Sequence, residues 1–278
     1  MSRPNIFVLC MHKAASTFVA NQLLDGLQER DPSLNVFHIG GELIKFNQWR
    51  KDELGVEAPT SRADRQKQLE EFFKWKQVPT ENAMVGRLYP GHLRVLRNHL
   101  PEALPSKKNK LLVVRRDPRD AMISMYYSVS YSHSIQGVEQ NPEKFMQDRK
   151  RYRNANIKRI LRGMLNGRGR NGLLREFEQL TDLILRNQRV VDLPYEMLVT
   201  DPHLWLAKFV EAAELENVVN DQWFEQTAAL LTPPTKEDPN SHKRRVKPGN
   251  WVDYFDEELE SLCKRVMGDR LAQFGYTW

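Results

Sequence analysis

The stretch "NIFVLCMHKAASTF" constrains the fold more than any other part of the chain. Its apolar run, Asn5–Cys10, is typical of a buried β-strand, and a helix-like apolar pattern begins at Phe18. The short loop between them contains Lys13, Ser16 and Thr17. A strand that turns tightly into a helix leaves backbone N–H groups unpaired, and the helix dipole adds partial positive charge. This arrangement predicts a binding site for a phosphate-bearing ligand.

The loop differs from the nucleotide-triphosphate loop G-x-x-x-x-G-K-[ST], in which the lysine adjoins a hydroxyl residue that binds magnesium. Here Ala14 and Ala15 follow Lys13, and the first hydroxyl comes three positions after the lysine. The usual magnesium ligand is therefore missing, and we expect transfer of a group other than a γ-phosphate. Ser16 and Thr17 are also ordinary helix N-caps, so taken alone they leave a structural role open.

The composition places few limits on the ligand. A formal net charge of +6 suits nucleotides, sulfated molecules, nucleic acid or a membrane surface without choosing among them. No segment approaches the roughly 20 apolar residues of a membrane span, and we expect no signal peptide. The only cysteines are Cys10 and Cys263, which argues against a disulfide framework and favours a cytoplasmic setting.

Short apolar runs alternate with helical stretches, which predicts an α/β fold with a mostly parallel central sheet flanked by helices. We expect one domain over residues 1–278. From 141 to 187 the pattern is helical but broken around "NGRGRNG", and a last amphipathic helix covers Asp256–Phe274. The expected strands are Asn5–Cys10, Ala83–Leu88, Lys110–Arg115 and Arg189–Leu193.

A second stretch, "LLVVRRDPRDAMISMYYS", places Arg116 at the carboxyl end of a buried strand. Open α/β sheets bind their ligands at that edge. Asp117 is positioned to cap the following helix, Pro118 fits its first turn, and Ser124 falls within it. A capped helix start with surface ion pairs would explain the same residues without any ligand.

Together, the two stretches resemble the sulfotransferases that use 3′-phosphoadenosine 5′-phosphosulfate (PAPS). In that family a loop of the type P-K-x-G-T-T-W binds the 5′-phosphosulfate, and a later R-[ND]-x-[KR]-D-x-x-x-S stretch binds the 3′-phosphate. The resemblance implies that the 3′-phosphate is bound by Arg116 and Ser124. It implies that the 5′ side is bound by Lys13, Ala14, Ala15, Ser16, Thr17 and Phe18.

Two further stretches resemble the family in the same order along the chain. "LPYEMLVTDP" places Tyr195 where the family has an adenine contact, and "RRVKPGNWVDYF" places Arg244 and Arg245 near the 3′-phosphate. The chain departs from the family at Ala15 and Val246, where the motifs have glycine. At Ala15 the turn must either avoid positive φ or accept strain.

The resemblance implies a P-loop nucleotide-kinase-like fold and metal-free, in-line sulfuryl transfer that releases adenosine 3′,5′-bisphosphate (PAP). Lys13 would stabilise charge on the departing phosphate. The acceptor would present a hydroxyl or amine on a small molecule or carbohydrate, with no nucleic-acid partner; the oligomeric state stays open. Residues 31–80 and 128–187 would form acceptor-site or lid insertions, and 232–250 would cover the donor.

The general base is less defined. Family members use a histidine within K-T-H-x-P or a glutamate after the first helix, and "GRLYPGHL" contains no complete copy of the histidine motif. His92 is the first candidate, Glu42 is the carboxylate alternative, and His99 and His38 are weaker. A neutral imidazole with a pKa of about 6.5 suits deprotonation of a hydroxyl.

Two other classes of protein remain open at this level. A P-loop kinase-like phosphotransferase would share the fold but needs the adjacent lysine–hydroxyl pair. A non-catalytic protein that binds nucleotide or nucleic acid would explain the positive charge and the "RRVK" run. It would not explain why Lys13, Arg116 and Ser124 recur at the spacing of the sulfotransferase motifs.

Overall fold

A computed structural model of the chain describes residues 3–56, 62–92, 109–132, 142–167, 172–187, 189–241 and 244–278. At its centre lies a five-stranded sheet in the order β2-β3-β1-β4-β5, in which every pairing is parallel. The predicted α/β fold is therefore confirmed. The strands are β1 Asn5–Cys10, β2 Asn35–His38, β3 Ala83–Leu88, β4 Asn109–Val114 and β5 Val190–Asp192.

The strand predictions hold best in the middle of the sheet. β1 and β3 have the expected bounds, β4 lies one residue earlier than expected, and β5 is two residues shorter. β2 was not predicted, because it is a four-residue edge strand with an exposed Asn35 and no continuous apolar run. It lies within 31–80, so that part of the chain completes the sheet in addition to adding helices.

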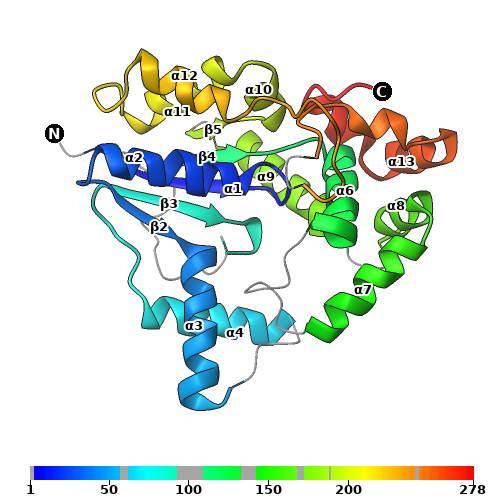
Figure 1. Cartoon of the computed structure of the whole chain (residues 1–278), viewed down its shortest axis with the longest axis horizontal. Coiled ribbons are helices and arrows are strands. Elements are labelled where there is room, and N and C mark those ends of the chain that lie inside the picture. Colours follow the sequence, from blue (N-terminus) through cyan, green and yellow to red (C-terminus); the bar gives the residue numbers. More distant parts are fainter. Residues whose placement is uncertain are drawn as a thin grey trace.

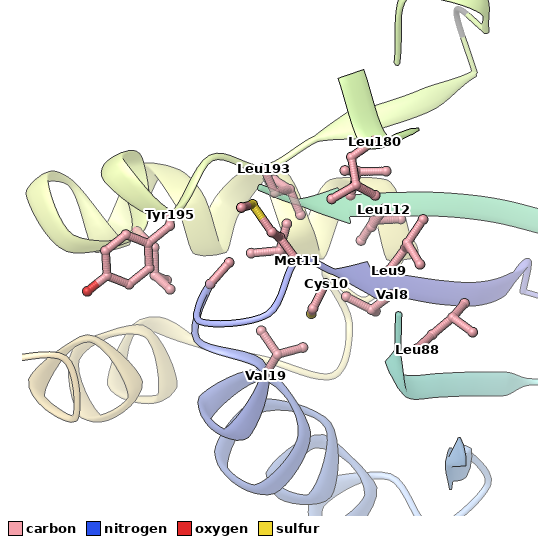
Figure 2. Close-up of a cluster of buried hydrophobic side chains, with 14 of the residues drawn as sticks. Val8, Leu9, Cys10, Met11, Val19, Leu88, Leu112, Leu180, Leu193 and Tyr195 are labelled. Carbon is pink, nitrogen blue, oxygen red and sulfur yellow. The ribbon is translucent and has the colours of Figure 1, made fainter. Parts of the chain in front are cut away.

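The middle strands are buried on both faces, as parallel strands covered by helices usually are. In β1, Val8, Leu9 and Cys10 are fully buried. Figure 2 shows them between Leu112 of β4 and Leu88 of β3. This packing fixes where β1 ends and where its loop begins.

The helices cover the sheet, and two of them reach away from it at one side. In Figure 1, α3 and α4 reach away from the sheet at the bottom of the view, whereas α10, α11 and α12 lie at the top. The helical run after β1 comprises α1 Ser16–Phe18, η1 Val19–Leu24 and α2 Asp25–Arg30. The other helices are α3 Ile39–Leu54, α4 Arg62–Trp75, α6 Pro118–Tyr127, η3 Ser128–Ser132, α7 Pro142–Asn154, α8 Ile157–Leu165, α9 Gly172–Arg186, α10 Tyr195–Thr200, α11 Pro202–Ala213, α12 Asp221–Ala229, η4 Asn250–Asp253 and α13 Glu257–Gln273.

The order in which the strands are added to the sheet changes direction between β1 and β4. From β1 the chain goes to β2 and β3 on one side, and from β4 it goes to β5 on the other. Open α/β sheets bind ligands at such a switch point, outside the carboxyl ends of the strands. Cys10 pairs with Val114 in the register of β1 and β4, so their loops start at the same level.

Helix α6 begins as the sequence predicted and also anchors the carboxyl-terminal segment. The Asp117 side chain accepts a hydrogen bond from the Arg119 backbone N–H, and Pro118 occupies the first turn. The buried Arg119 guanidinium pairs with Asp117 at 2.7 Å and lies 3.9 Å from the Trp251 ring centre and 4.5 Å from that of Trp278. The segment around Trp251 is thereby held against the start of α6.

Candidate active site

The loop after β1 adopts a strained backbone. Lys13 and Ala15 have φ values of 68° and 60°, whereas Ala14 between them is not in the positive-φ region. Left-handed backbone costs a non-glycine residue about 1–2 kcal/mol, because its Cβ approaches a carbonyl oxygen. The Ala14 N–H donates a 3.1 Å hydrogen bond to the Met11 carbonyl oxygen, so the loop closes on itself. Left-handed residues in such a turn can direct neighbouring N–H groups toward an anion, as in an anion-binding nest. The loop therefore accepts strain at Ala15.

Lys13 carries a charge that no carboxylate among the described residues neutralises. Its Nζ donates a 2.6 Å hydrogen bond to Oγ of Ser128, the first residue of η3. Burial, and to a lesser degree the charge of Arg116, lower the pKa of Lys13 from 10.5 to about 8. An anion bound in the loop would raise the pKa of Lys13 again and favour its protonated form.

Arg116, two residues after β4, reaches back to the first loop. Its Nη1 donates a 2.8 Å hydrogen bond to the Lys13 carbonyl oxygen. Its guanidinium lies 4.1 Å from the ring centre of Tyr195, the first residue of α10. The Arg116 Nε is buried and has no hydrogen-bond partner within the described part of the chain. A buried unpaired donor is rare and costs about 1–3 kcal/mol, so the site has the chemistry to receive an acceptor oxygen.

One face of α6 carries the polar residues next to Arg116. Asp120, Ser124 and Ser128 follow at intervals of four, so they lie on the same side of this helical run. The Asp120 carboxylate accepts 2.8 Å hydrogen bonds from the backbone N–H groups of Gly249 and Trp251. Burial raises the pKa of Asp120. This residue, which the sequence analysis left without a role, brings the segment before η4 to the second motif.

Arg244 and Arg245 lie on that segment and each has a carboxylate partner. Arg244 is buried, pairs with Glu237 and has its guanidinium 4.0 Å from the ring centre of Tyr127 on α6. Arg245 is more exposed and lies 2.5 Å from Asp253. Each of these two arginines is therefore engaged in an ion pair within the protein, and their role at the 3′-phosphate stays a prediction.

The remaining loop residues differ in their surroundings. The Ser16 hydroxyl lies 3.1 Å from the hydroxyl of Tyr89, which comes directly after β3. Thr17 is exposed, and Phe18 packs partly buried against the core. Val19 is fully buried and points back from the helical run toward β1 (Figure 2).

The predicted general bases lie in different environments. His92 accepts a long hydrogen bond of 3.4 Å from the Tyr89 N–H, and burial, with a smaller effect of His12, lowers its pKa to about 4. Glu42 on α3 lies 2.6 Å from Lys45 and 3.2 Å from Lys76. Burial opposes ionisation of Glu42, but these lysines outweigh it and leave its pKa below the ordinary value.

The two weaker candidates for the general base are His38 and His99. His38 Nε2 bonds to Asp25 at 2.7 Å at the edge of the sheet, while its Nδ1 is buried without a partner in the described chain. His99 lies outside the described residues.

A histidine that the sequence analysis did not consider lies inside the loop itself. His12 bonds to Glu176 of α9 through both its backbone N–H and its ring. Its ring stacks on Tyr89 with 4.0 Å between the ring centres. No sequence signal linked His12 to Glu176, because 164 residues separate them. The only signal in the sequence that could have pointed to His12 is its position next to Lys13.

The sequence matches the model of a known protein family. The family model described as the sulfotransferase domain matches residues 7–275. The chain belongs to the sulfotransferase domain family. A search of curated protein sequences gave no significant match.

Solved structures of sulfotransferases and of retinol dehydratase share the fold at low sequence identity. The mouse sulfotransferase SULT7A1 complexed with PAP is 15% identical, with a TM-score of 0.55 over 98% of this chain and 88% of the other. Retinol dehydratase in a complex with retinol and PAP is 16% identical, with a TM-score of 0.57 over 100% and 84%. Sulfotransferase STF9 from Mycobacterium avium is 12% identical, with a TM-score of 0.50 over 99% and 78%.

The described ranges of this sulfotransferase contain neither a membrane-spanning helix nor a metal-binding cluster. No helix there is long and apolar enough to cross a bilayer. Among the same residues, no group of three or more histidine, cysteine, aspartate and glutamate side chains is arranged to hold a metal ion.

The strain at Ala15 predicts that Ala15→Gly stabilises the protein. Relief of the left-handed backbone outweighs the extra chain entropy of glycine by about 0.5–1 kcal/mol, which should raise Tm by roughly 2 °C. Ala14→Gly is the matched control, because Ala14 is fully buried without positive φ and loses packing. Thermal unfolding measures both; an Ala15→Gly variant that melts as low as Ala14→Gly would contradict the strain.

Proposed function

We propose that the protein transfers the sulfuryl group of PAPS to a hydroxyl or amine of an acceptor and releases PAP. The observation that carries this proposal is the 2.8 Å hydrogen bond from Arg116 to the Lys13 carbonyl oxygen. It holds the Arg116 guanidinium against the backbone of the loop that carries Lys13, and the charge of Arg116 is close enough to help lower the pKa of Lys13. One nucleotide with two charged ends would contact both groups at this switch point of the sheet. The PAP complexes named for the solved mouse sulfotransferase and retinol dehydratase support the same ligand.

The 5′ end of the donor binds in the loop after β1 in this proposal. The strained backbone of Lys13 and Ala15 directs N–H groups outward, and Ser16 and Thr17 add hydroxyl donors. Phe18 holds the loop on the core. The positive end of the following helical run adds to the attraction for the phosphosulfate.

The 3′-phosphate binds at Arg116 and Ser124. The unpaired Arg116 Nε supplies a donor for a phosphate oxygen, and Tyr195 holds the guanidinium from one face. Ser124 lies on the same face of α6 as Asp120. Since Asp120 draws the segment with Arg244 and Arg245 to this helix, these two arginines are the further cations proposed for the 3′-phosphate.

The chemistry that follows is an in-line displacement at sulfur. The acceptor oxygen or nitrogen forms the new bond to sulfur, and the bond from sulfur to the 5′-phosphate oxygen breaks with its electron pair on that oxygen. Lys13 stabilises the charge that grows there, and such preorganised stabilisation is often the largest part of catalysis. The step needs no metal ion, because Lys13 supplies the positive charge.

The acceptor is proposed to lie over η3, beside Lys13. Tyr131 lies three residues after Ser128, the hydrogen-bond partner of Lys13, and its ring centre is 5.9 Å from that of Tyr127. The aromatic residues of α3 and α4 pack on one another as well, as Phe46 does with Phe72 and Trp75. Retinol and androsterone in the structures of retinol dehydratase support a small-molecule acceptor, and a carbohydrate is the other class proposed.

Lys13→Ala should lower sulfuryl transfer by about 10²–10³-fold, the usual cost of removing a group that stabilises transition-state charge. Lys110→Ala is the control, because Lys110 lies near the amino end of β4, at the opposite edge of the sheet, and pairs with Glu214. Release of PAP from PAPS measures both variants. If Lys13→Ala transfers the sulfuryl group at the wild-type rate, Lys13 does not stabilise the charge on the departing phosphate.

Because the pKa of Lys13 is lowered, its role in stabilising the departing phosphate should appear in the pH dependence of the reaction rate. Lys13 must be protonated to act, so kcat/KM, which reports the free enzyme, should fall as the pH rises above about 8. Bound PAPS stabilises the charged lysine, so the corresponding limb of kcat should lie at higher pH.

Arg116→Met should reduce the ratio of PAP affinity to 5′-AMP affinity by at least about tenfold. Only PAP carries the 3′-phosphate, and a charge-assisted hydrogen bond contributes about 1.5–3 kcal/mol. Arg162→Met on α8, where Arg162 pairs with Glu258 at the surface, is the matched control. Calorimetric titration gives both affinities; equal losses for PAP and 5′-AMP would place the 3′-phosphate elsewhere.

A further inference from the structure

A carboxylate holds His12, the residue before Lys13 in the phosphate loop, in two places. The His12 backbone N–H donates a 2.9 Å hydrogen bond to Glu176 Oε2, and His12 Nδ1 lies 2.5 Å from Glu176 Oε1. Glu176 belongs to α9, so a helix from a distant part of the sequence fixes both the chain and the ring of the residue before Lys13. The Nδ1 contact places the ring proton on that nitrogen when the imidazole is neutral.

The ring of His12 is also held by Tyr89, which in turn contacts Ser16. The His12 and Tyr89 rings stack with 4.0 Å between their centres and 14° between their planes. The Tyr89 hydroxyl in turn lies 3.1 Å from Ser16 Oγ in the phosphate loop. His12 Nε2, on the opposite edge of the ring from Nδ1, makes no hydrogen bond within the described residues, and the side chain is 43% exposed. A single orientation therefore leaves one basic nitrogen free on the residue that precedes Lys13.

We propose that His12 is the general base of the transfer reaction and that Glu176 positions it. The inference rests on the proposed sulfotransferase function. The proton of the acceptor hydroxyl moves to His12 Nε2 as the oxygen–sulfur bond forms. The bond from sulfur to the 5′-phosphate oxygen breaks, and its electron pair stays on the oxygen that Lys13 stabilises. Glu176 keeps the required tautomer and stabilises the imidazolium that results.

The surroundings of the other two candidates favour His12. His92 Nδ1 faces the Tyr89 N–H, and a base whose pKa is about 4 accepts a proton weakly near neutral pH. The Glu42 carboxylate is occupied by two lysines. His12 has a free nitrogen, a carboxylate partner and a place next to Lys13 in the chain.

The first test compares His12→Gln with His203→Gln. His203 also pairs with a glutamate, Glu225 at 3.2 Å, but it lies on the exposed surface of α11. PAP release is followed with labelled PAPS, with 2-naphthol or water as the acceptor. His12→Gln should lose about 10²-fold or more in rate while its PAP affinity stays within about threefold of wild type. A rate equal to that of His203→Gln would overturn the proposal.

A second test needs no turnover and no variant. Diethyl pyrocarbonate modifies accessible neutral imidazoles, and the tryptic peptide that ends at Lys13 contains His12 as its only histidine. Bound PAPS should slow modification of His12 at least about fivefold and leave His203 unchanged. Modification of His12 at the same rate with and without PAPS would overturn the proposal. Failure of the wild-type protein to bind PAP in calorimetry would instead contradict the sulfotransferase assignment.

The kinetics of Glu176→Gln and Glu176→Asp separate positioning from a structural role. Glutamine keeps the size of the side chain, but its amide can donate to His12 Nδ1 and favour the wrong tautomer of the ring. Glu176→Gln should therefore lower kcat by about 10²-fold or more, while KM for PAPS stays within about threefold of wild type. Glu176→Asp keeps the carboxylate and should recover part of the rate. Turnover of Glu176→Gln at the wild-type kcat would exclude Glu176 from this role.

Discussion

The hydrogen bond from the Arg116 guanidinium to the Lys13 carbonyl oxygen joins the two loops on which the site depends. Its geometry follows from the sheet, because Cys10 and Val114 pair in register and each loop starts at the same edge. A slip of one residue would turn every side chain of a strand to the other face and separate the two cations. The buried central strands, with Val8, Leu9 and Leu112 packed together in Figure 2, prevent such a slip.

Around this hydrogen bond, the positive charges of the site are not fully neutralised by the protein, which would suit an anion with two phosphate groups. Lys13 and Arg116 are close, like-charged and mostly buried, and the described residues give Lys13 no carboxylate partner. Asp120 lies 3.9 Å from Arg116, but its oxygens are used by two backbone N–H groups of the carboxyl-terminal segment. Uncompensated buried charge is costly, and so is the left-handed backbone at Ala15. The proposed donor, with a charged group at each end, would offset the cost of the buried charges.

Residues close together in the sequence could be predicted well. The strand–loop–helix of the first motif and the Asp117 cap of α6 are local patterns, and both appear in the structure. β2 escaped prediction because an edge strand has no continuous apolar run. The contacts of Asp120 with Gly249, and of His12 with Glu176, join positions more than 100 residues apart. No periodicity or spacing encodes such pairs, so only the three-dimensional arrangement could reveal them.

Calorimetric titration with PAP, magnesium–ATP and a short RNA tests the central claim most directly, since the three ligands differ in where they carry negative charge. One PAP should bind per chain, at least about 100-fold more tightly than magnesium–ATP, because only PAP presents phosphates to Lys13 and Arg116 together. The short RNA should not compete with it. Binding of magnesium–ATP or RNA as tight as that of PAP would contradict a site built for a nucleotide with phosphates at its 3′ and 5′ positions.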